Sequence, residues 1–295
     1  MTRQRFLNLL LPAALTALSA ACTDDAPSVP GAVRFQAQGT LTVDVTRATY
    51  EGSWRTTDEI AVRRSDGTVR KFVPDDALAA TSLSPATGVQ PFLWPVDMSN
   101  QTFSAWAPYS ATQPTSKTVD ADQSAVTDAV FYGYDLLYAP AVTTTYGNTV
   151  GLTFKHQLAL VLVDVVSTPE TVSSVTFGSA NVKTSGTVSM AATPSWSSLS
   201  GANTITMRRI GSSAAGGNYA CLLPPQSFGN ASTALISVTT SAKTYTYKAA
   251  VTLVAGQKNA YNVTVEKTGI TVTGTITNWT NGGTTNGGTL EVVGE

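Results

Sequence analysis

The feature that most constrains the fold of this chain is an alternation of apolar and polar residues with a period of two. It is clearest in residues 40–46, 245–253, 260–266 and 270–277, where threonine fills most of the polar positions. Such alternation places apolar side chains on one face of a β-strand and polar side chains on the other. Threonine, valine and tyrosine also suit a half-buried pleated surface. The pattern predicts an all-β protein, since no segment carries the helical period over the length of an ordinary helix.

Turn-forming residues separate these strands at short intervals. They gather at residues 65–67, 146–148, 214–218, 255–257 and 281–283. Short strands bounded by such turns are typical of β-sandwiches, in which two sheets pack face to face. One segment differs, because residues 152–166 begin amphipathic and become apolar on both faces. We interpret it as a central strand that is buried on both sides.

The chain is long enough to form two modest domains. It has 295 residues, of which 42% are hydrophobic, and its five tryptophans fall in both halves of the sequence. The loop around residues 167–169, which contains a proline, is the predicted boundary. We therefore predict two β-sandwich domains in tandem, an N-terminal domain over 37–167 and a C-terminal domain over 168–295.

The first residues have the pattern of a secretory signal peptide. Arg3 and Arg5 precede a mostly apolar run over residues 6–20, and small residues lead up to Cys22. The run is about 15 residues long, whereas a helix needs about 20 to cross a bilayer. We predict a signal peptide over 1–21 that is followed by a lipidated cysteine. The alternatives are an uncleaved membrane anchor and ordinary cleavage that leaves a free thiol, because Ser19 stands where a lipobox more often has leucine.

This reading predicts a lipoprotein of the outer membrane, attached through an acyl chain such as palmitate on Cys22. Residues 22–36 would then form a linker between the lipid and the first domain. The only other cysteine is Cys221, so a lipidated Cys22 leaves no pair for a disulfide. The net charge of −1 provides no basic field, and we expect no nucleic-acid partner.

The residues that catalysis would require are scarce. The chain has one histidine, His156, and it lies in the segment predicted to be a buried strand, where a core role is the simpler interpretation. No glycine-rich phosphate loop and no nucleophile-elbow motif occur. We therefore expect no enzyme activity, no catalytic residues, no metal site and no cofactor. Two distant carboxylates could still form a glycosidase site, but nothing in the sequence points to one.

Short motifs spread over most of the chain occur in a specific order. One is the Leu-x-Phe-x-His-x-Leu-Ala motif of residues 152–159. The others lie at residues 46–49, 54, 57–62, 103–109, 135–139, 222–226, 256–261 and 276–279. Together they resemble the fimbrillin family of Bacteroidales, the subunits of type V pili. Thr57 departs from the pattern, because the family commonly has glycine there.

The resemblance implies β-sandwich domains of transthyretin-like, Greek-key topology and a role as an adhesive subunit of a surface fimbria. It also implies a precursor that an arginine-specific protease cuts after an early strand. Arg47 is the first candidate cleavage site, and Arg34 is the second. The strand lost by cleavage at Arg47 would carry Leu41, Val43 and Val45. Another subunit would then fill the vacated groove with an extended segment of its own.

The resemblance also implies a donor strand, and residues 270–295 are the candidate. Its apolar residues are Ile270, Val272, Ile276, Leu290 and Val292. The expected partners are other fimbrial subunits and an unidentified surface receptor. The alternative is that these strands complete the C-terminal domain of the same subunit, because the sequence pattern is the same in both cases.

A second class of function stays open from the sequence. A monomeric outer-membrane lipoprotein with this fold could bind a glycan or a protein ligand. Tyr132, Tyr134 and Tyr138 are the candidate aromatic residues that would stack on sugar rings, and packing in the core is the alternative for each.

Overall fold

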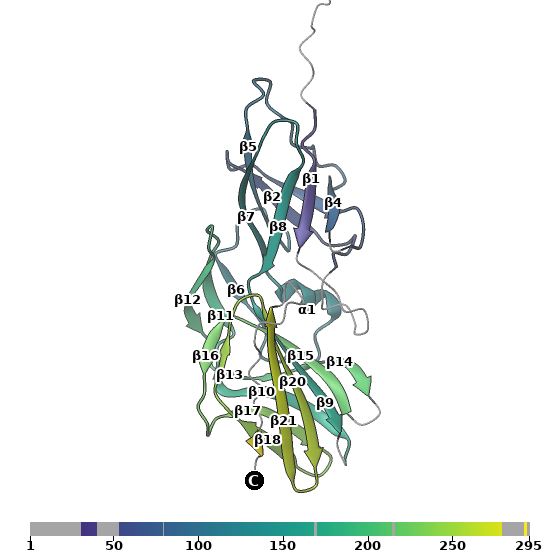
Figure 1. The fold of residues 1–295 in the computed structure, drawn as a ribbon, viewed down its shortest axis with the longest axis vertical. Helices are drawn as coiled ribbons and strands as arrows, with labels where there is room; N and C mark the ends of the chain where they lie inside the picture. Colours follow the sequence, from purple (N-terminus) through teal and green to yellow (C-terminus); the bar gives the residue numbers. More distant parts are fainter. Residues whose placement is uncertain are drawn as a thin grey trace, which may run out of the picture.

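The computed structural model describes residues 31–39, 53–78, 80–167, 170–213, 216–278 and 292–293. The prediction of an all-β protein is confirmed, because strands dominate and the described residues form a single short helix, α1 (Asp128–Tyr134). Figure 1 shows a group of N-terminal strands and a group of C-terminal strands arranged along the long axis, with α1 between them. None of the helical segments in the described ranges has the length and apolar character of a membrane span.

Seven strands of the N-terminal half form one closed barrel in the order β1-β4-β3-β2-β5-β7-β8. Their bounds are β1 (Phe35–Gly39), β2 (Ile60–Arg64), β3 (Val69–Pro74), β4 (Ala80–Pro85), β5 (Gln101–Ala107), β7 (Leu137–Thr144) and β8 (Val150–His156). This differs from the sandwich of two sheets that we predicted for this half. Alternation defines which face of a strand is buried, but it does not reveal whether the first and last strands of a sheet pair with each other.

The core of the barrel is rich in aromatic side chains. Phe35, Phe72, Phe92 and Phe103 are all at most 2% exposed, and their rings contact one another mainly edge to face. Offset and edge-to-face arrangements are the favourable geometries for aromatic pairs. The barrel is therefore filled by side chains and has no lumen to act as a channel.

The C-terminal half contains two larger sheets. One has the order β14 (Arg208–Ser213), β15 (Gly216–Leu223), β9 (Ala159–Ser167), β20 (Gln257–Glu266), β21 (Gly269–Asn278) and β22 (Val292–Val293). The other has the order β13 (Asn203–Thr206), β10 (Val172–Val182), β17 (Ala234–Thr240) and β18 (Thr244–Lys248). Their buried side chains share one core, and the rings of Phe177 on β10 and Tyr261 on β20 lie 6.4 Å apart.

Two small sheets complete this half. One has the order β12 (Ser195–Ser200), β11 (Ser185–Ser189) and β6 (Ser116–Thr118), and the other pairs β16 (Gln226–Phe228) with β19 (Val251–Leu253). Strand β6 comes from the segment between β5 and α1, so a piece of the N-terminal half is built into the C-terminal sheets.

The predicted single strand over 152–166 is wrong, because the chain forms two strands there, β8 and β9. They are separated at Gln157, whose backbone N–H donates to the carbonyl of Leu136. Strand β8 alternates between buried and less buried residues as a barrel strand should, whereas β9 lies in the middle of the six-stranded sheet. The chain thus changes sheet at residues 157–158, ahead of the boundary predicted at 167/168.

Candidate functional site

Strand β1 is the element that closes the barrel, and its position is the first candidate site. It pairs antiparallel with β4, where Phe35 lies opposite Leu83, and parallel with β8, where Phe35 lies opposite Val150. Figure 1 shows β1 between these two strands. We call this position, between β4 and β8, the strand slot.

The side chains of β1 and the residues just before it alternate between the core and the surface. Val33, Phe35 and Ala37 are 5%, 2% and 0% exposed, respectively. Arg34 and Gln38 are exposed, and Gln36 between them is partly exposed. The strand slot therefore receives one face of a short segment, with a large side chain near its middle and a small one two residues later.

Phe35 makes the closest aromatic contacts of the slot. Its ring centroid lies 4.9 Å from that of Phe103, 5.0 Å from that of Phe72 and 6.1 Å from that of Phe92. All three partners come from outside β1, on β5, β3 and the loop before β5. Loss of β1 would leave an aromatic pocket without its central ring, next to two strand edges without a partner.

Of the residues predicted for processing, the structure describes only Arg34. It is exposed, it directly precedes β1, and its guanidinium donates to the carbonyl of Gly147 at 3.4 Å. The remaining predictions, Cys22 as the lipidated residue, Arg47 as the cleavage site and Leu41, Val43 and Val45 as the lost strand, lie outside the described residues.

Strand β1 itself was not predicted from the sequence. The alternation of Val33, Phe35 and Ala37 with polar residues is a signal that could have identified it. The signal was weak because β1 is only five residues long and ends in glycine.

The predicted donor residues fall in two parts of the six-stranded sheet. Ile270 and Val272 lie on β21 and are 6% and 1% exposed within their own subunit. Strand β21 pairs with β20 over its whole length, and Ile276 is part of this ladder. The backbone of Val292 on β22 pairs with that of Val272. Leu290 lies outside the described residues.

A second candidate site is a cavity of about 430 Å³ beneath the barrel, which we call the junction crevice. Its lining includes residues that follow one another in the segment before β2, at the end of β5 and on α1. They are Ser53, Trp54, Arg55, Thr57, Asp58, Glu59, Ala107, Pro108, Tyr109, Ala129, Tyr132, Gly133, Asp135, Leu137 and His156. Several of the family-like motifs therefore meet here, although they are far apart in the sequence.

Two carboxylates of the junction crevice are held by neighbouring side chains. Arg55 donates to both carboxylate oxygens of Asp58, through its guanidinium and through its backbone N–H. His156 is 2.8 Å from a carboxylate oxygen of Asp135 through Nδ1. Asp58 and Asp135 are therefore each paired within the crevice, and nothing among the described residues groups three metal-binding side chains.

A lysine lies next to this cavity. Lys117 on β6 donates to the carbonyl of Gly133 at 2.5 Å. Burial lowers the pKa of Lys117, and the nearby negative charge of Asp135 partly opposes this effect. The contact connects the small sheet that contains β6 to the end of α1.

The three tyrosines predicted for ligand stacking have different environments. Tyr134 and Tyr138 are only 8% and 4% exposed and belong to the core. Tyr132 is partly buried and lines the junction crevice, and the guanidinium of Arg55 lies 4.0 Å from its ring centroid. Of the three, Tyr132 is the tyrosine with access to a cavity.

Comparisons with known proteins agree with this architecture. A candidate cell adhesion protein from Bacteroides uniformis superposes with a TM-score of 0.62 at 22% identity, over 84% of this chain and 99% of that one. Another from Bacteroides ovatus gives 0.64 at 18% identity, over 85% and 98%. A fimbrial protein from Bacteroides ovatus gives 0.50 at 15% identity, over 81% of this chain and 49% of that one. At these identities the similarity establishes the fold alone.

Sequence comparison adds the family. Among curated protein sequences, none matches this chain. The sequence profile of the Fimbrillin-like family, in contrast, matches residues 46–279, which is well over half of the chain. The match begins next to Arg47 and ends at Trp279, so it spans both the barrel and the C-terminal sheets. This chain therefore belongs to the Fimbrillin-like family.

Proposed function

We propose that this protein is a subunit of an adhesive cell-surface fimbria, exported to the outer membrane as a lipoprotein through Cys22. Proteolysis after Arg47 removes β1, and a segment of another subunit then occupies the strand slot. The observation that carries this proposal is that β1, which begins with the buried Phe35, closes the barrel from the N-terminal side of the predicted cleavage site.

The physical driving force for polymerisation is the state of the barrel after β1 has left. The edges of β4 and β8 lose their backbone partners, and unpaired strand edges readily accept another strand. The pocket of Phe72, Phe92 and Phe103 is opened to water. An incoming strand restores both the hydrogen bonds and the apolar contacts, so assembly between subunits replaces a contact within one subunit.

The tail after β21 is the donor that best fits this mechanism. Strand β21 is paired along its full length and buries Ile270 and Val272, so its departure would disrupt the C-terminal core. In the tail, Leu290, Val292 and Gly294 are spaced by two residues. Phe35, Ala37 and Gly39 of β1 have the same spacing and the same order of a large residue, a smaller one and glycine.

The test is treatment of the purified precursor with a trypsin-like arginine protease, followed by mass spectrometry and native gels. We expect a cut after Arg47 and the appearance of stable multimers. Arg47→Ala should block both, and Arg34→Ala is the matched control that should leave both intact. A chain that is cut after Arg47 and remains monomeric would contradict polymerisation by strand exchange. A chain that resists cleavage there would correspond to an anchor subunit or to a stand-alone lipoprotein.

The junction crevice favours a second candidate function, the binding of a neutral glycan by an uncut monomer. Tyr132 supplies an aromatic ring at the cavity, and the one arginine of the lining, Arg55, is already paired with Asp58, so its guanidinium is not available to an anionic ligand. Titration of the uncut protein with lactose and with N-acetylglucosamine tests this function. Saturable binding that Tyr132→Ala removes and Tyr132→Phe retains would support it, and the absence of binding to either sugar would exclude these ligands.

A further inference from the structure

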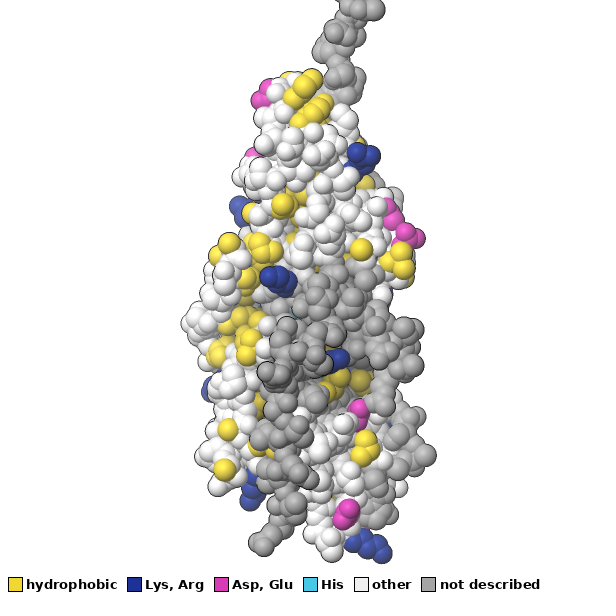
Figure 2. Space-filling view, in the orientation of Figure 1, with side chains coloured by type: hydrophobic (Ala, Val, Ile, Leu, Met, Phe, Trp, Pro, Cys, Tyr) yellow, Lys and Arg dark blue, Asp and Glu magenta, His cyan; other side chains and the backbone are white. Residues whose placement is uncertain are grey.

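The end of the barrel that is distant from the C-terminal sheets presents an unusual group of exposed apolar side chains. Leu93, Val96 and Met98 are 48%, 78% and 60% exposed. Seven large hydrophobic side chains are exposed among the described residues, and these three lie within six residues of one another. We call residues 93–98 the tip loop. Figure 2 shows apolar side chains grouped at this end of the molecule.

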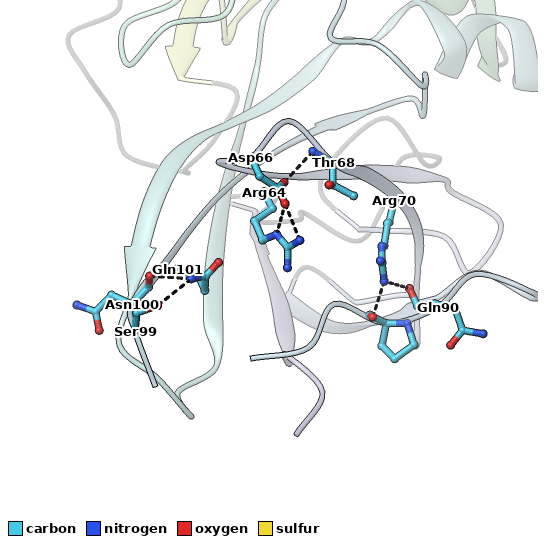
Figure 3. Close-up of polar contacts among 9 residues, drawn as sticks. Arg64, Asp66, Thr68, Arg70, Gln90, Ser99, Asn100 and Gln101 are labelled. Carbon is cyan, nitrogen blue, oxygen red and sulfur yellow. Dashed lines mark hydrogen bonds and ion pairs between the residues drawn. The ribbon is translucent and has the colours of Figure 1, made fainter. Parts of the chain in front are cut away.

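The tip loop is held firmly at its start. The two aromatic residues that flank Leu93, Phe92 and Trp94, are 0% and 4% exposed and are inserted into the barrel core. The guanidinium of Arg70 donates to the carbonyls of Gln90 and Pro91, at 2.7 and 2.5 Å (Figure 3). These contacts fix the position from which the loop leaves the barrel.

The loop is also fixed at its end. The side chain of Gln101 at the start of β5 donates to the carbonyl of Asn100 at 3.0 Å, as Figure 3 shows. The backbone N–H of Met98 donates to the carbonyl of Pro95, and Met98 has a φ of 56°. A positive φ is uncommon for a residue other than glycine and indicates a strained turn.

The fold does not require apolar residues at these positions. Turns of this kind usually contain small or polar residues, because their side chains face water. Val96 and Met98 instead present their side chains to solvent from a rigid frame, which reduces the entropy that a binding partner would have to overcome. The tip loop therefore has the properties of a preformed apolar contact surface.

The chain enters the barrel beside this loop. Ala32 forms a β-bridge with Leu93, and the N–H of Trp94 donates to the carbonyl of Gly31 at 3.1 Å. Gly31 is nine residues after Cys22. A fully extended chain of that length spans about 30 Å at most. An acyl group on Cys22 would thus hold the tip loop within about 30 Å of the lipid surface.

We propose that the tip loop docks on the surface of the lipid bilayer in the unprocessed, lipid-anchored protein, with Val96 and Met98 in contact with the lipid. This rests on the lipid anchor in the proposed function. The charges near the loop nearly cancel, because Arg64 pairs with Asp66. Arg34 and Arg70 supply two further positive charges and Asp97 supplies one negative charge, which leaves a net charge of only +1. Docking is therefore apolar and does not depend on anionic lipids.

The contact can be measured without relying on acylation. The mature chain, with Cys22→Ser and an oligohistidine extension before it, is tethered to phosphatidylcholine vesicles that contain nickel-chelating lipid. An environment-sensitive dye is placed at Val96→Cys or, as the matched control, at Val166→Cys. Val166 is 49% exposed at the distant end of β9. Cys221 is fully buried and does not compete for the label.

We expect the dye at position 96 to shift to the blue and to be quenched by brominated lipid, while the dye at position 166 remains in water. The double variant Val96→Asp and Met98→Asp should weaken vesicle binding of the untethered chain by about tenfold or more, and Val166→Asp should not. Equal quenching at the two positions, or none at either, would overturn the proposal. Protection of position 96 that requires a high protein concentration and no vesicles would also overturn it and would indicate a second copy of this chain.

Acylation is tested separately by the intact mass of the cell-derived protein. An unmodified Cys22 would exclude the lipid anchor of the proposed function. The tethered-vesicle result would then still decide whether the tip loop binds lipid when it is held close to it.

Discussion

The barrel and the C-terminal sheets differ in whether their outermost strands have a free edge. The barrel has no free edge because β1 joins β4 to β8. The six-stranded sheet is open, and its last long strand, β21, is extended only by the two-residue strand β22 among the described residues. One half therefore depends on a short segment near one end of the chain, and the other half presents the opposite end as a strand at its margin. Under the proposed function, this difference would allow one subunit to act as both acceptor and donor.

The two hydrophobic cores also differ in their residue types and in how much of the packing a single strand supplies. The barrel core is a cluster of aromatic rings, in which Phe35 of β1 is a central member. The core of the C-terminal sheets is mainly aliphatic and draws on many strands, with Leu160 and Val163 on the central β9 fully buried. Removal of a single strand from the barrel therefore affects a large share of its packing, whereas the C-terminal core has no comparable single contributor at its margin.

The largest expected effect comes from Phe35→Ala. Truncation of a buried phenylalanine leaves a cavity and typically costs 3–5 kcal/mol, or about 4 kcal/mol here, of the free energy of unfolding. We expect this loss to appear in the barrel, because all ring contacts of Phe35 lie there. Urea denaturation followed by tryptophan fluorescence measures it. Gln36→Ala, on the same strand, is the matched control and should change stability by no more than about 0.5 kcal/mol. Equal losses for the two variants would show that β1 does not anchor the barrel.

Leu160→Ala tests the core of the C-terminal sheets in the same way. Leu160 is fully buried on β9, and its truncation should cost about 2–5 kcal/mol. The loss should fall on the C-terminal sheets, so amide hydrogen exchange should accelerate in β15 and β20, the neighbours of β9, and not in β1 to β5. Faster exchange throughout the barrel as well would mean that the two halves unfold as one unit.

Alkaline pH should destabilise the C-terminal half before the barrel, without any mutation. Burial and the adjacent Asp120 raise the pKa of Tyr134 to about 12, and burial raises the pKa of Tyr261 and of Cys221. A group whose pKa is higher in the folded state stabilises the fold below its unfolded pKa and loses that contribution as pH rises through the folded value. Stability should therefore decline above about pH 9, where an unfolded cysteine begins to ionise, and continue to decline to about pH 12.

These groups lie on α1, β15 and β20, so the decline should begin outside the barrel core. Thermal unfolding at stepped pH, with near-ultraviolet absorbance of tyrosinate as a second signal, follows it. Tyr261→Phe should reduce the alkaline decline. If the barrel lost its structure before the C-terminal sheets as pH rises, these three groups would not be the cause of the decline.

The smallest expected effect is an acid effect in the barrel. The side-chain hydrogen bond from Arg64 lowers the pKa of Asp66 to about 2. A group with a lowered folded pKa stabilises the fold above its unfolded pKa, near 3.8, and loses that contribution as pH falls towards 2. Because the Asp66 side chain is 47% exposed, solvent screening limits this to about 1 kcal/mol or less. Asp66→Asn should reduce the pH dependence of thermal unfolding in that window. Asp97→Asn provides the comparison, because hydrogen bonds from Ser99, without an arginine, lower the pKa of that carboxyl.

The candidate site was predicted from the sequence only in part. The family-like motifs correctly indicated the family, and the lone His156 is buried in a strand and paired with Asp135. The strand that fills the slot was missed because five residues with glycine at the end give a weak periodic signal. The junction crevice could not be predicted, because its lining comes from four separate parts of the chain that only tertiary packing brings together.

What the sequence determined by itself is local. Alternation with threonine on the outer face fixed the all-β class, since side chains of consecutive strand residues must point to opposite faces. Tertiary structure decided the rest. It split residues 152–166 into β8 and β9, because Gln157 hydrogen-bonds to Leu136 and the two strands find partners in different sheets. It also closed the N-terminal strands into a barrel, because the pairing of β1 with β8 joins residues more than one hundred positions apart, and alternation within a strand contains no information about such a partner.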